Sequence, residues 1–268
     1  MELEQSLEKF KGKGLGVVAI SYDSQELLHH FAERMGGFSY PLLADPESTI
    51  IRDFGIFNTN VPEGHEWYGM CFPGTYIVNE KGVVQSKYFE EMHRQRYTAD
   101  SILVKEFGED GVKSKRYRSD HLFLTVSAAQ RSLRPGNIVT LVFDLVLTEK
   151  MHVYAPGVEG YRPVAVEVVE HPMLKAHPTT FPEAKTLHLE AIDETVPVYE
   201  GEVRILQDVT ISPRIREEEL TIPVDFSYQA CDDQICYPPF KFQVEVTLDI
   251  EQHDRERAPE HLRKKGEK

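Results

Sequence analysis

Two cysteines five positions apart, Cys231 and Cys236, constrain the local fold of this 268-residue chain more than any other feature. Five steps of extended strand would span roughly 16 Å, whereas a disulfide holds its two Cα atoms about 4.4–6.8 Å apart. If the two sulfurs bond, the residues between them must fold back as a turn. Asp232 and Asp233 suit such a turn, because Asp side chains hydrogen-bond the nearby backbone and tolerate turn conformations.

A disulfide across so short a loop is a weak staple, since its stabilisation grows with loop length and is about 2 kcal/mol here. A local pair at a turn is therefore typical of a dithiol that opens and closes. Two alternatives remain: a static local disulfide, and two reduced thiols or half of a metal site. The metal alternative needs two more ligands, and neither a Cys-x-x-Cys nor a His-x-His pair lies nearby. We expect no metal and no cofactor.

The composition is that of an ordinary globular protein, with 41% hydrophobic and 28% charged residues. The length predicts two domains. The net charge of −14 argues against nucleic acid or an anionic membrane surface as the main partner. No apolar run approaches the roughly 20 residues of a membrane span, and the first residues lack the order of a signal peptide. As written, the chain is expected in the cytoplasm, or in the periplasm if an upstream segment is missing.

The first part of the chain alternates between helical and strand-like patterns. Helices are predicted over residues 1–11, 24–35 and 99–107, with one or two helical turns over 46–54. Strands are predicted over residues 15–21, 42–43, 74–78 and 83–88. Ser24 is the predicted cap of the second helix, and Glu80-Lys81-Gly82 is a hairpin signal. This order predicts an α/β domain over residues 1–108.

Three segments of this part resemble the redoxin (AhpC/TSA, peroxiredoxin-like) branch of the thioredoxin fold: residues 16–24, 40–46 and 72–82. The resemblance covers about residues 1–107. It implies that Pro73 is the cis-proline that faces the active site in that family. It also implies that Thr75 begins the next strand.

The same resemblance implies a catalytic cysteine at the N-terminus of the first helix, where the helix dipole lowers a thiol pKa. No cysteine lies between Met1 and Gly69, so no residue here takes that role. Cys71 is expected to be a packing residue, or alternatively to lie near the vacated site. Peroxidase activity is not expected of this chain.

The family's strand before that helix is missing as well. It would lie between the strands that match residues 17–21 and 75–78. We therefore expect that Met1 is not the biological start, and that an upstream segment carries the strand and a Cys or selenocysteine motif. The alternative is a homo-oligomer formed by strand exchange.

The pattern changes to short β runs after a polar, charged linker over residues 109–119. Pro/Gly turns separate these runs and no helical pattern intervenes, which predicts an all-β sandwich over residues 120–252. The predicted strands cover residues 121–128, 137–147, 151–154, 164–169, 199–211, 220–228 and 240–250. Residues 253–268 form a charged tail to which we assign no function.

The residues around the cysteine pair, Tyr228-Gln-Ala-Cys231 and Cys236-Tyr-Pro-Pro, resemble the active-site hairpin of the N-terminal (alpha) domain of the thiol:disulfide interchange protein DsbD. The resemblance implies an immunoglobulin-like sandwich. It also implies an electron relay, in which the dithiol receives electrons from one thioredoxin-like partner and passes them to another. Tyr228 and Tyr154 carry over as residues that support the pair.

Two further positions follow from this resemblance. His152 replaces an aromatic residue of the strand that flanks the cysteines. It could carry protons during thiol exchange, or it is an exposed histidine without a role. Residues 181–197 fall where the family has a cap loop that shields the sulfurs. The capping residue would be Phe181, His188 or Leu189.

The charges beside the pair favour exchange chemistry. Asp232 and Asp233 disfavour a neighbouring thiolate, so neither sulfur is expected to be a peroxidase-type nucleophile. By resemblance, Cys236 faces the partner. The leading hypothesis is a thiol–disulfide oxidoreductase that exchanges electrons with a thioredoxin-like partner or with its own redoxin domain. The alternatives are a non-catalytic redoxin-like scaffold with a static disulfide, and a truncated product of a two-domain thiol or selenol peroxidase.

Overall fold

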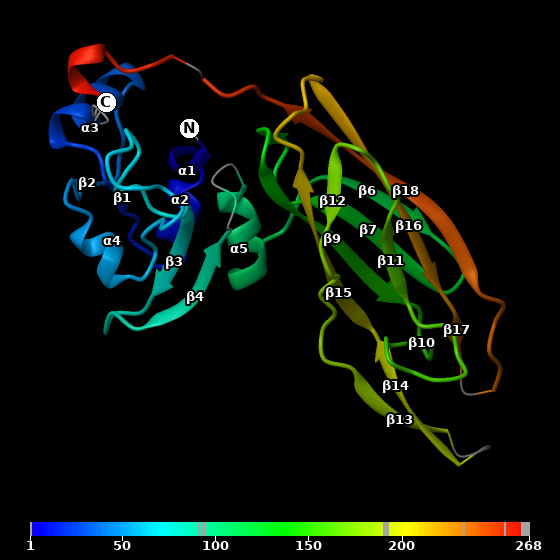
Figure 1. Ribbon diagram of the computed structural model, residues 1–268. Coiled ribbons are helices and arrows are strands. Elements are labelled where there is room, and N and C mark those ends of the chain that lie inside the picture. The colour runs from blue at the N-terminus through cyan, green and yellow to red at the C-terminus, as the bar shows by residue number, and fades with distance from the viewer. Residues whose placement is uncertain are drawn as a thin grey trace. The chain divides into compact units, whose positions relative to one another are not determined.

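The computed structural model describes residues 2–90, 92, 95–189, 193–232, 234–254 and 256–263. It divides the chain into two compact units (Figure 1). The N-terminal unit comprises Met1–Ala99 together with His253–Lys268, and the C-terminal unit comprises Asp100–Gln252. Among the described residues, no helix is long and apolar enough to cross a membrane.

The N-terminal unit has the α/β order that the sequence predicted. Its helices are α1 (Glu2–Gln5), α2 (Leu7–Gly12), α3 (Gln25–Arg34) and α4 (Thr49–Asp53), with a 3-10 turn η1 (Glu260–Leu262). Its strands are β1 (Ala19–Ser21), β2 (Leu42–Ala44), β3 (Gly74–Val78), β4 (Val84–Phe89) and β5 (Arg96–Tyr97). The single helix predicted over residues 1–11 is thus two short helices, and the strand predicted over 15–21 is confined to its last three residues.

Helix α3 begins where its cap was predicted. Ser24 has extended backbone angles, and its hydroxyl oxygen accepts a hydrogen bond from the Leu27 N–H at 3.2 Å. This bond satisfies one of the donors that the first turn of a helix leaves open. The helix ends at Arg34. Gly36 and Gly37 follow with positive φ, and the Gly37 N–H donates to the Ala32 carbonyl.

Four strands of this unit, β1 to β4, form two separate pairs. β1 and β2 pair in parallel, and β3 and β4 pair as the predicted antiparallel hairpin. Its turn is closed by the Asn79 side-chain oxygen, which accepts from the N–H groups of Lys81 and Val83 at 3.0 Å each. In the ranges that the structure describes, no strand joins the two pairs into one sheet.

The prediction of a cis-proline at Pro73 is wrong, since no cis peptide bond occurs among the described residues. The chain on both sides of Pro73 is held in extended pairings. The Phe72 N–H donates to the Ile56 carbonyl at 2.8 Å, and Gly74 opens β3 opposite Phe89. The trans isomer, which X–Pro bonds favour by about 0.5–1 kcal/mol, fits this path.

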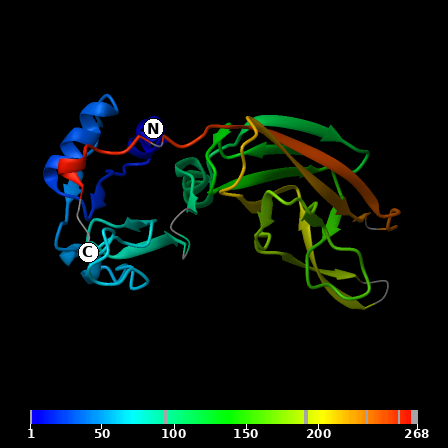
Figure 2. The same ribbon diagram turned by 45° about the horizontal axis from the view of Figure 1, so that its top comes forward.

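The C-terminal unit is built almost entirely of strands. They are β6 (Val112–Arg118), β7 (Leu122–Ala128), β8 (Ser132–Leu133), β9 (Asn137–Leu147), β10 (His152–Tyr154), β11 (Ala165–Val168), β12 (Leu174–Ala176), β13 (Lys185–Leu189), β14 (Glu194–Glu200), β15 (Glu202–Ile211), β16 (Glu219–Tyr228), β17 (Ala230–Cys231) and β18 (Phe240–Ile250). One sheet has the order β12-β15-β9-β7-β6, a second β11-β16-β18-β8, and a third β13-β14-β10-β17. The third sheet lies at one end of the other two (Figures 1 and 2).

The main core lies between the first two sheets. Inward side chains of β7, β9 and β15 meet those of β16 and β18 in one buried cluster. Phe143 and Phe226, for example, stack across it with ring centroids 6.3 Å apart. Alternating burial along β16 and β18 gives these strands one core face and one open face, as in a sandwich. This arrangement confirms the predicted immunoglobulin-like class.

Helix α5 (Ala99–Phe107) covers the other face of β9 and β15. Ser101 Oγ accepts from the Thr140 N–H at 2.9 Å, and Lys105 Nζ lies 2.6 Å from Asp208 Oδ2. The sequence counted this helix with the first domain. The compact units place the boundary earlier than this prediction, at Asp100, because from there onward the chain contacts the sandwich strands.

Two further boundaries differ from prediction. Residues 109–119 were expected to be a linker, but Val112–Arg118 form β6, which pairs with β7 at the border of the sheet. Polar and basic side chains are common on such edge strands, so composition alone resembled a linker. The strand predicted over 199–211 is broken at Gly201, whose positive φ lets the chain pass from the third sheet into the first.

Candidate functional site

The two cysteines of the C-terminal unit form a disulfide. Cys231 and Cys236 have their Cα atoms 4.1 Å apart and face each other as an isolated antiparallel bridge. Their exposures are opposite: Cys231 is 1% exposed, whereas Cys236 lies at the surface. Of the two cysteines, Cys236 is therefore the residue in contact with solvent.

Asp232 closes the turn between the cysteines. Its Oδ1 accepts from the N–H groups of Gln234 and Ile235 at 2.8 Å each, and its Oδ2 accepts from the Tyr237 hydroxyl at 3.0 Å. The bonds from Ile235 and Gln234 lower the pKa of the Asp232 carboxyl. The charged carboxylate of Asp232 thus stabilises the turn through these hydrogen bonds. Asp233, the other predicted turn residue, lies outside the described residues.

Strand β10 brings Tyr154 to the disulfide. β10 pairs with β17, with His152 opposite Cys231. The Tyr154 hydroxyl lies 3.4 Å from Cys236 Sγ and 3.5 Å from Cys231 Sγ. A disulfide carries no S–H, so the hydroxyl is the donor. Burial raises the pKa of Tyr154, and the charge of Glu194 adds to the shift.

His152 is buried, with 3% of its surface exposed. Its ring meets the Tyr154 ring edge-on at 5.8 Å. The alternative of an exposed histidine is therefore wrong. Neighbouring residues of a strand ordinarily point to opposite faces, and here both faces of β10 are covered.

Tyr228, predicted to support the pair, lies in the main core. Its hydroxyl donates to Ser119 Oγ at 2.7 Å, and its ring packs near those of Phe226 and Phe240. Tyr228 therefore holds the strand that leads into the cysteine hairpin.

The third sheet supplies a cover for the buried sulfur. A small buried cluster, separate from the main core, consists of Tyr154, Val196, Val198 and Cys231. Leu187 and Leu189 of β13 pack against it. Of the three predicted capping residues, Leu189 is thus the one that packs against this cluster. His188 alternates to the open face, and Phe181 packs against the main core.

Tyr161 and Glu194 belong to the site although the sequence did not single them out. The Tyr161 ring stacks on the Tyr154 ring with centroids 4.3 Å apart. Its hydroxyl donates to Glu194 Oε2 at 2.8 Å, and this bond raises the pKa of Tyr161 to about 12. Residues 33 apart in the chain meet here, and no sequence pattern relates them.

The remaining cysteine, Cys71, lies in the N-terminal unit. It is half-buried and forms an isolated bridge with Phe57. Burial raises the pKa of its thiol. Reactive cysteines are low-pKa thiols near positive charge or a helix N-terminus, whereas at Cys71 burial outweighs the lowering effect of the Arg96 charge and the pKa is raised.

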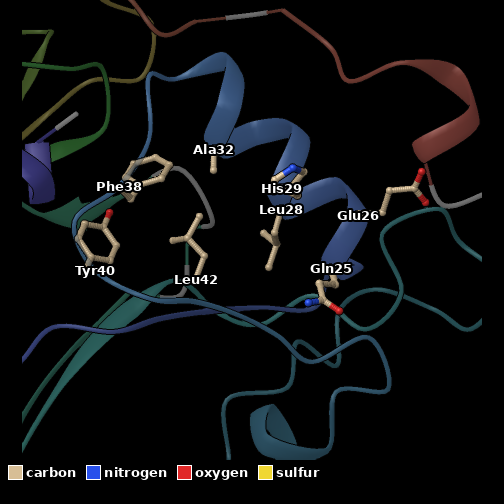
Figure 3. A pocket seen from close by; sticks show the side chains of 8 residues that line it. All are labelled: Gln25, Glu26, Leu28, His29, Ala32, Phe38, Tyr40 and Leu42. Carbon is tan, nitrogen blue, oxygen red and sulfur yellow. The ribbon is translucent and has the colours of Figure 1, made fainter.

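The N-terminal unit also carries an open groove of about 570 Å³ along α3. In Figure 3 the apolar side chains of Leu28, Ala32, Phe38 and Leu42 face it, with Tyr40 at one end. No side chain of α3 is buried. The groove therefore marks an incompletely covered apolar helix face. Within the described ranges, no cluster of three or more His, Cys, Asp or Glu side chains is placed to hold a metal ion.

Comparison with known proteins assigns each part of the chain to a family model. Residues 1–87 match the AhpC/TSA family, and residues 120–248 match the N-terminal part of the thiol:disulfide interchange protein DsbD. The fold and the disulfide thus define the chain as a redoxin-like region followed by a DsbD N-terminal-like sandwich. This combination fits thiol–disulfide electron relay.

Curated relatives of the first part include a putative peroxiredoxin bcp of Buchnera aphidicola, 25% identical over 33% of this chain and 54% of the relative. Alkyl hydroperoxide reductase C of Staphylococcus haemolyticus is 26% identical over 32% of this chain and 43% of the relative. The chain spans about half the length of these relatives or less.

The solved structures that resemble part of the chain include two bacterial domains. The N-terminal periplasmic domain of ScsB from Proteus mirabilis has a TM-score of 0.36 and 12% identity, covering 51% of this chain and 50% of that one. The reduced N-terminal domain of Neisseria meningitidis DsbD has a TM-score of 0.30 and 14% identity, covering 41% of this chain and 77% of that one.

Proposed function

We propose that the chain is a thiol–disulfide oxidoreductase module in which Cys231 and Cys236 relay electrons. One observation carries the proposal: the disulfide joins an exposed cysteine to a buried one, and the hydroxyl of one buried tyrosine reaches both sulfurs. A purely structural bond has no need of one exposed sulfur, and a five-residue separation makes it a weak staple.

The exchange proceeds through Cys236. A partner thiolate attacks Cys236 Sγ, the S–S bond breaks, and Cys231 leaves as a thiolate while a mixed disulfide forms. A second partner thiolate then attacks the partner's own sulfur in that mixed disulfide and releases Cys236. The pair gains two electrons and takes up two protons, and the partner dithiol becomes a disulfide. His152 is proposed as a proton carrier, since its strand pairs with Cys231.

The partner class is a thioredoxin-like dithiol protein. Resolution of the mixed disulfide needs a second thiol on the partner. Cys71 is the only other cysteine of this chain. Residues 1–108 contain one thiol, and the proposed partner is a separate thioredoxin-like protein or the redoxin-like region itself.

The test is differential alkylation of the folded chain. After mild dithiothreitol treatment, mass spectrometry should find Cys231 and Cys236 labelled together, with a reduction potential above about −300 mV. Label that enters only after unfolding, or a lower potential, would instead support the static disulfide of a non-catalytic scaffold.

A homo-oligomer is a further part of the proposal. β1–β2 and β3–β4 are separate pairs, and Val18, Ile20 and Leu43 are 37–52% exposed. Open strand edges beside exposed apolar side chains favour pairing with another chain. Sedimentation at several concentrations should detect a self-associated species, and a monomer throughout would contradict this part alone.

A further inference from the structure

The Tyr154 hydroxyl is placed to stabilise the leaving sulfur of Cys231. The rate of the proposed exchange therefore depends on where this hydroxyl is held. When Cys236 is attacked, negative charge forms on Cys231 Sγ, 3.5 Å from the Tyr154 hydroxyl. A hydrogen bond to a charged acceptor is roughly twice as strong as a neutral one. Shifts of about 1 Å in such a donor are enough to lose much of its effect.

The strand that carries Tyr154 provides little support by itself. β10 is only three residues long. The Tyr154 ring belongs to the small cluster with Val196, Val198 and Cys231, not to the main core. Tyr161 packs against this cluster and covers the Tyr154 ring in a stack at 4.3 Å, with the two planes 28° apart.

Tyr161 is itself anchored to another strand. Its hydroxyl donates to Glu194 Oε2 at the start of β14, and β14 pairs with β10. Glu194 therefore holds Tyr161 by a hydrogen bond, and Tyr161 stacks on Tyr154, whose hydroxyl contacts both sulfurs.

We propose that Tyr161, anchored by Glu194, is a positioning residue that holds the Tyr154 hydroxyl against the Cys231 sulfur during exchange; this rests on the proposed exchange function. Tyr154 donates a hydrogen bond and keeps its proton. Burial, and after it the charge of Glu194, raises the pKa of Tyr154, and the hydrogen bond to Glu194 raises the pKa of Tyr161, so both hydroxyls keep their protons. Other titratable groups close to Cys231 are His152, which lies opposite it in β10, and Asp232 on the turn, which accepts from the Tyr237 hydroxyl.

The first measurement is the rate at which dithiothreitol reduces the disulfide in the whole chain. Tyr161→Leu removes the stacked ring and Glu194→Ala removes its anchor; each should slow reduction by roughly threefold or more, and Tyr154→Phe by roughly tenfold. Glu194→Gln keeps an oxygen acceptor and should restore most of the rate. Tyr199→Phe is the matched control. It removes a hydroxyl from β14, the strand that carries Glu194, but this hydroxyl donates to the Pro182 carbonyl and not to the site.

The second measurement is the pKa of the Cys231 thiol in a Cys236→Ser background. It is obtained from the pH dependence of the Cys231 Cβ chemical shift in NMR. Tyr161→Leu should raise this pKa, because the thiolate loses its donor, and Tyr199→Phe should leave it unchanged. An unchanged rate and an unchanged thiol pKa in Tyr161→Leu would overturn the proposal, whatever happens to the melting temperature. If dithiothreitol does not reduce the parent disulfide, the exchange function fails, and the thiol pKa alone decides the positioning role.

Discussion

Cys231 and Cys236 face each other across one antiparallel bridge, yet only Cys231 is buried. Strand β17 places Cys231 beside β10 within the third sheet, whereas Cys236 follows the turn as an exposed residue. Under the proposed exchange, these two chemically identical sulfurs have different roles: Cys236 is the one attacked and Cys231 is the one that leaves.

The first prediction tests this asymmetry. In Cys231→Ser, the remaining Cys236 thiol should react with an aromatic disulfide reagent at least about tenfold faster than the Cys231 thiol in Cys236→Ser, because access controls thiol exchange. Stopped-flow absorbance of the released thiol measures both rates. Equal rates would remove the basis for assigning Cys236 as the attacked sulfur.

The second prediction concerns Asp232 and pH. Its folded-state pKa is depressed, so its contribution to stability is present above the unfolded value of about 3.9 and is lost as the pH falls through the folded value. The melting temperature of the parent chain should therefore fall more steeply below about pH 4 than that of Asp232→Asn. Parallel curves for the two chains would show that the turn does not depend on this charge.

The third prediction concerns Arg204, which ties β15 to the segment before β6. Its guanidinium binds Asp144 Oδ1 and Oδ2 at 2.6 and 3.0 Å and donates to the Gly108 carbonyl at 2.7 Å. Arg204→Ala should lower the free energy of unfolding by about 1–2 kcal/mol, since the pair is two-pronged but partly exposed. Urea unfolding measures the change.

Arg131→Ala is the matched control for this experiment. Arg131 pairs with Asp249 but its side chain is 70% exposed, and such pairs contribute about 0–1 kcal/mol. A loss at Arg131 as large as that at Arg204 would contradict the assignment of Arg204 as the anchor.

The fourth prediction is that this chain does not reduce hydroperoxides appreciably. Cys71 is half-buried with a raised thiol pKa, so little of it is thiolate at neutral pH. A coupled assay with dithiothreitol as reductant should give the same background for the parent chain and for Cys71→Ser. Turnover that disappears in Cys71→Ser would identify Cys71 as a nucleophile.

Much of the fold could be predicted from local pattern. β3, α5, β9 and β18 have the bounds that periodicity predicted, and Ser24 caps α3 as expected. These elements carry their signal within a few residues. β6 could not be predicted, because its polar side chains become a strand only through pairing with β7.

The candidate site divides in the same way. The spacing of Cys231 and Cys236 determined that a disulfide between them would have to close a turn, because five extended residues reach farther than the Cα separation that an S–S bond allows. Which sulfur is buried, and that Tyr161 and Glu194 support Tyr154, was decided by tertiary structure alone. Burial and stacking depend on how β10, β14 and β17 pair, and that pairing brings together residues whose separation along the chain carries no local signal.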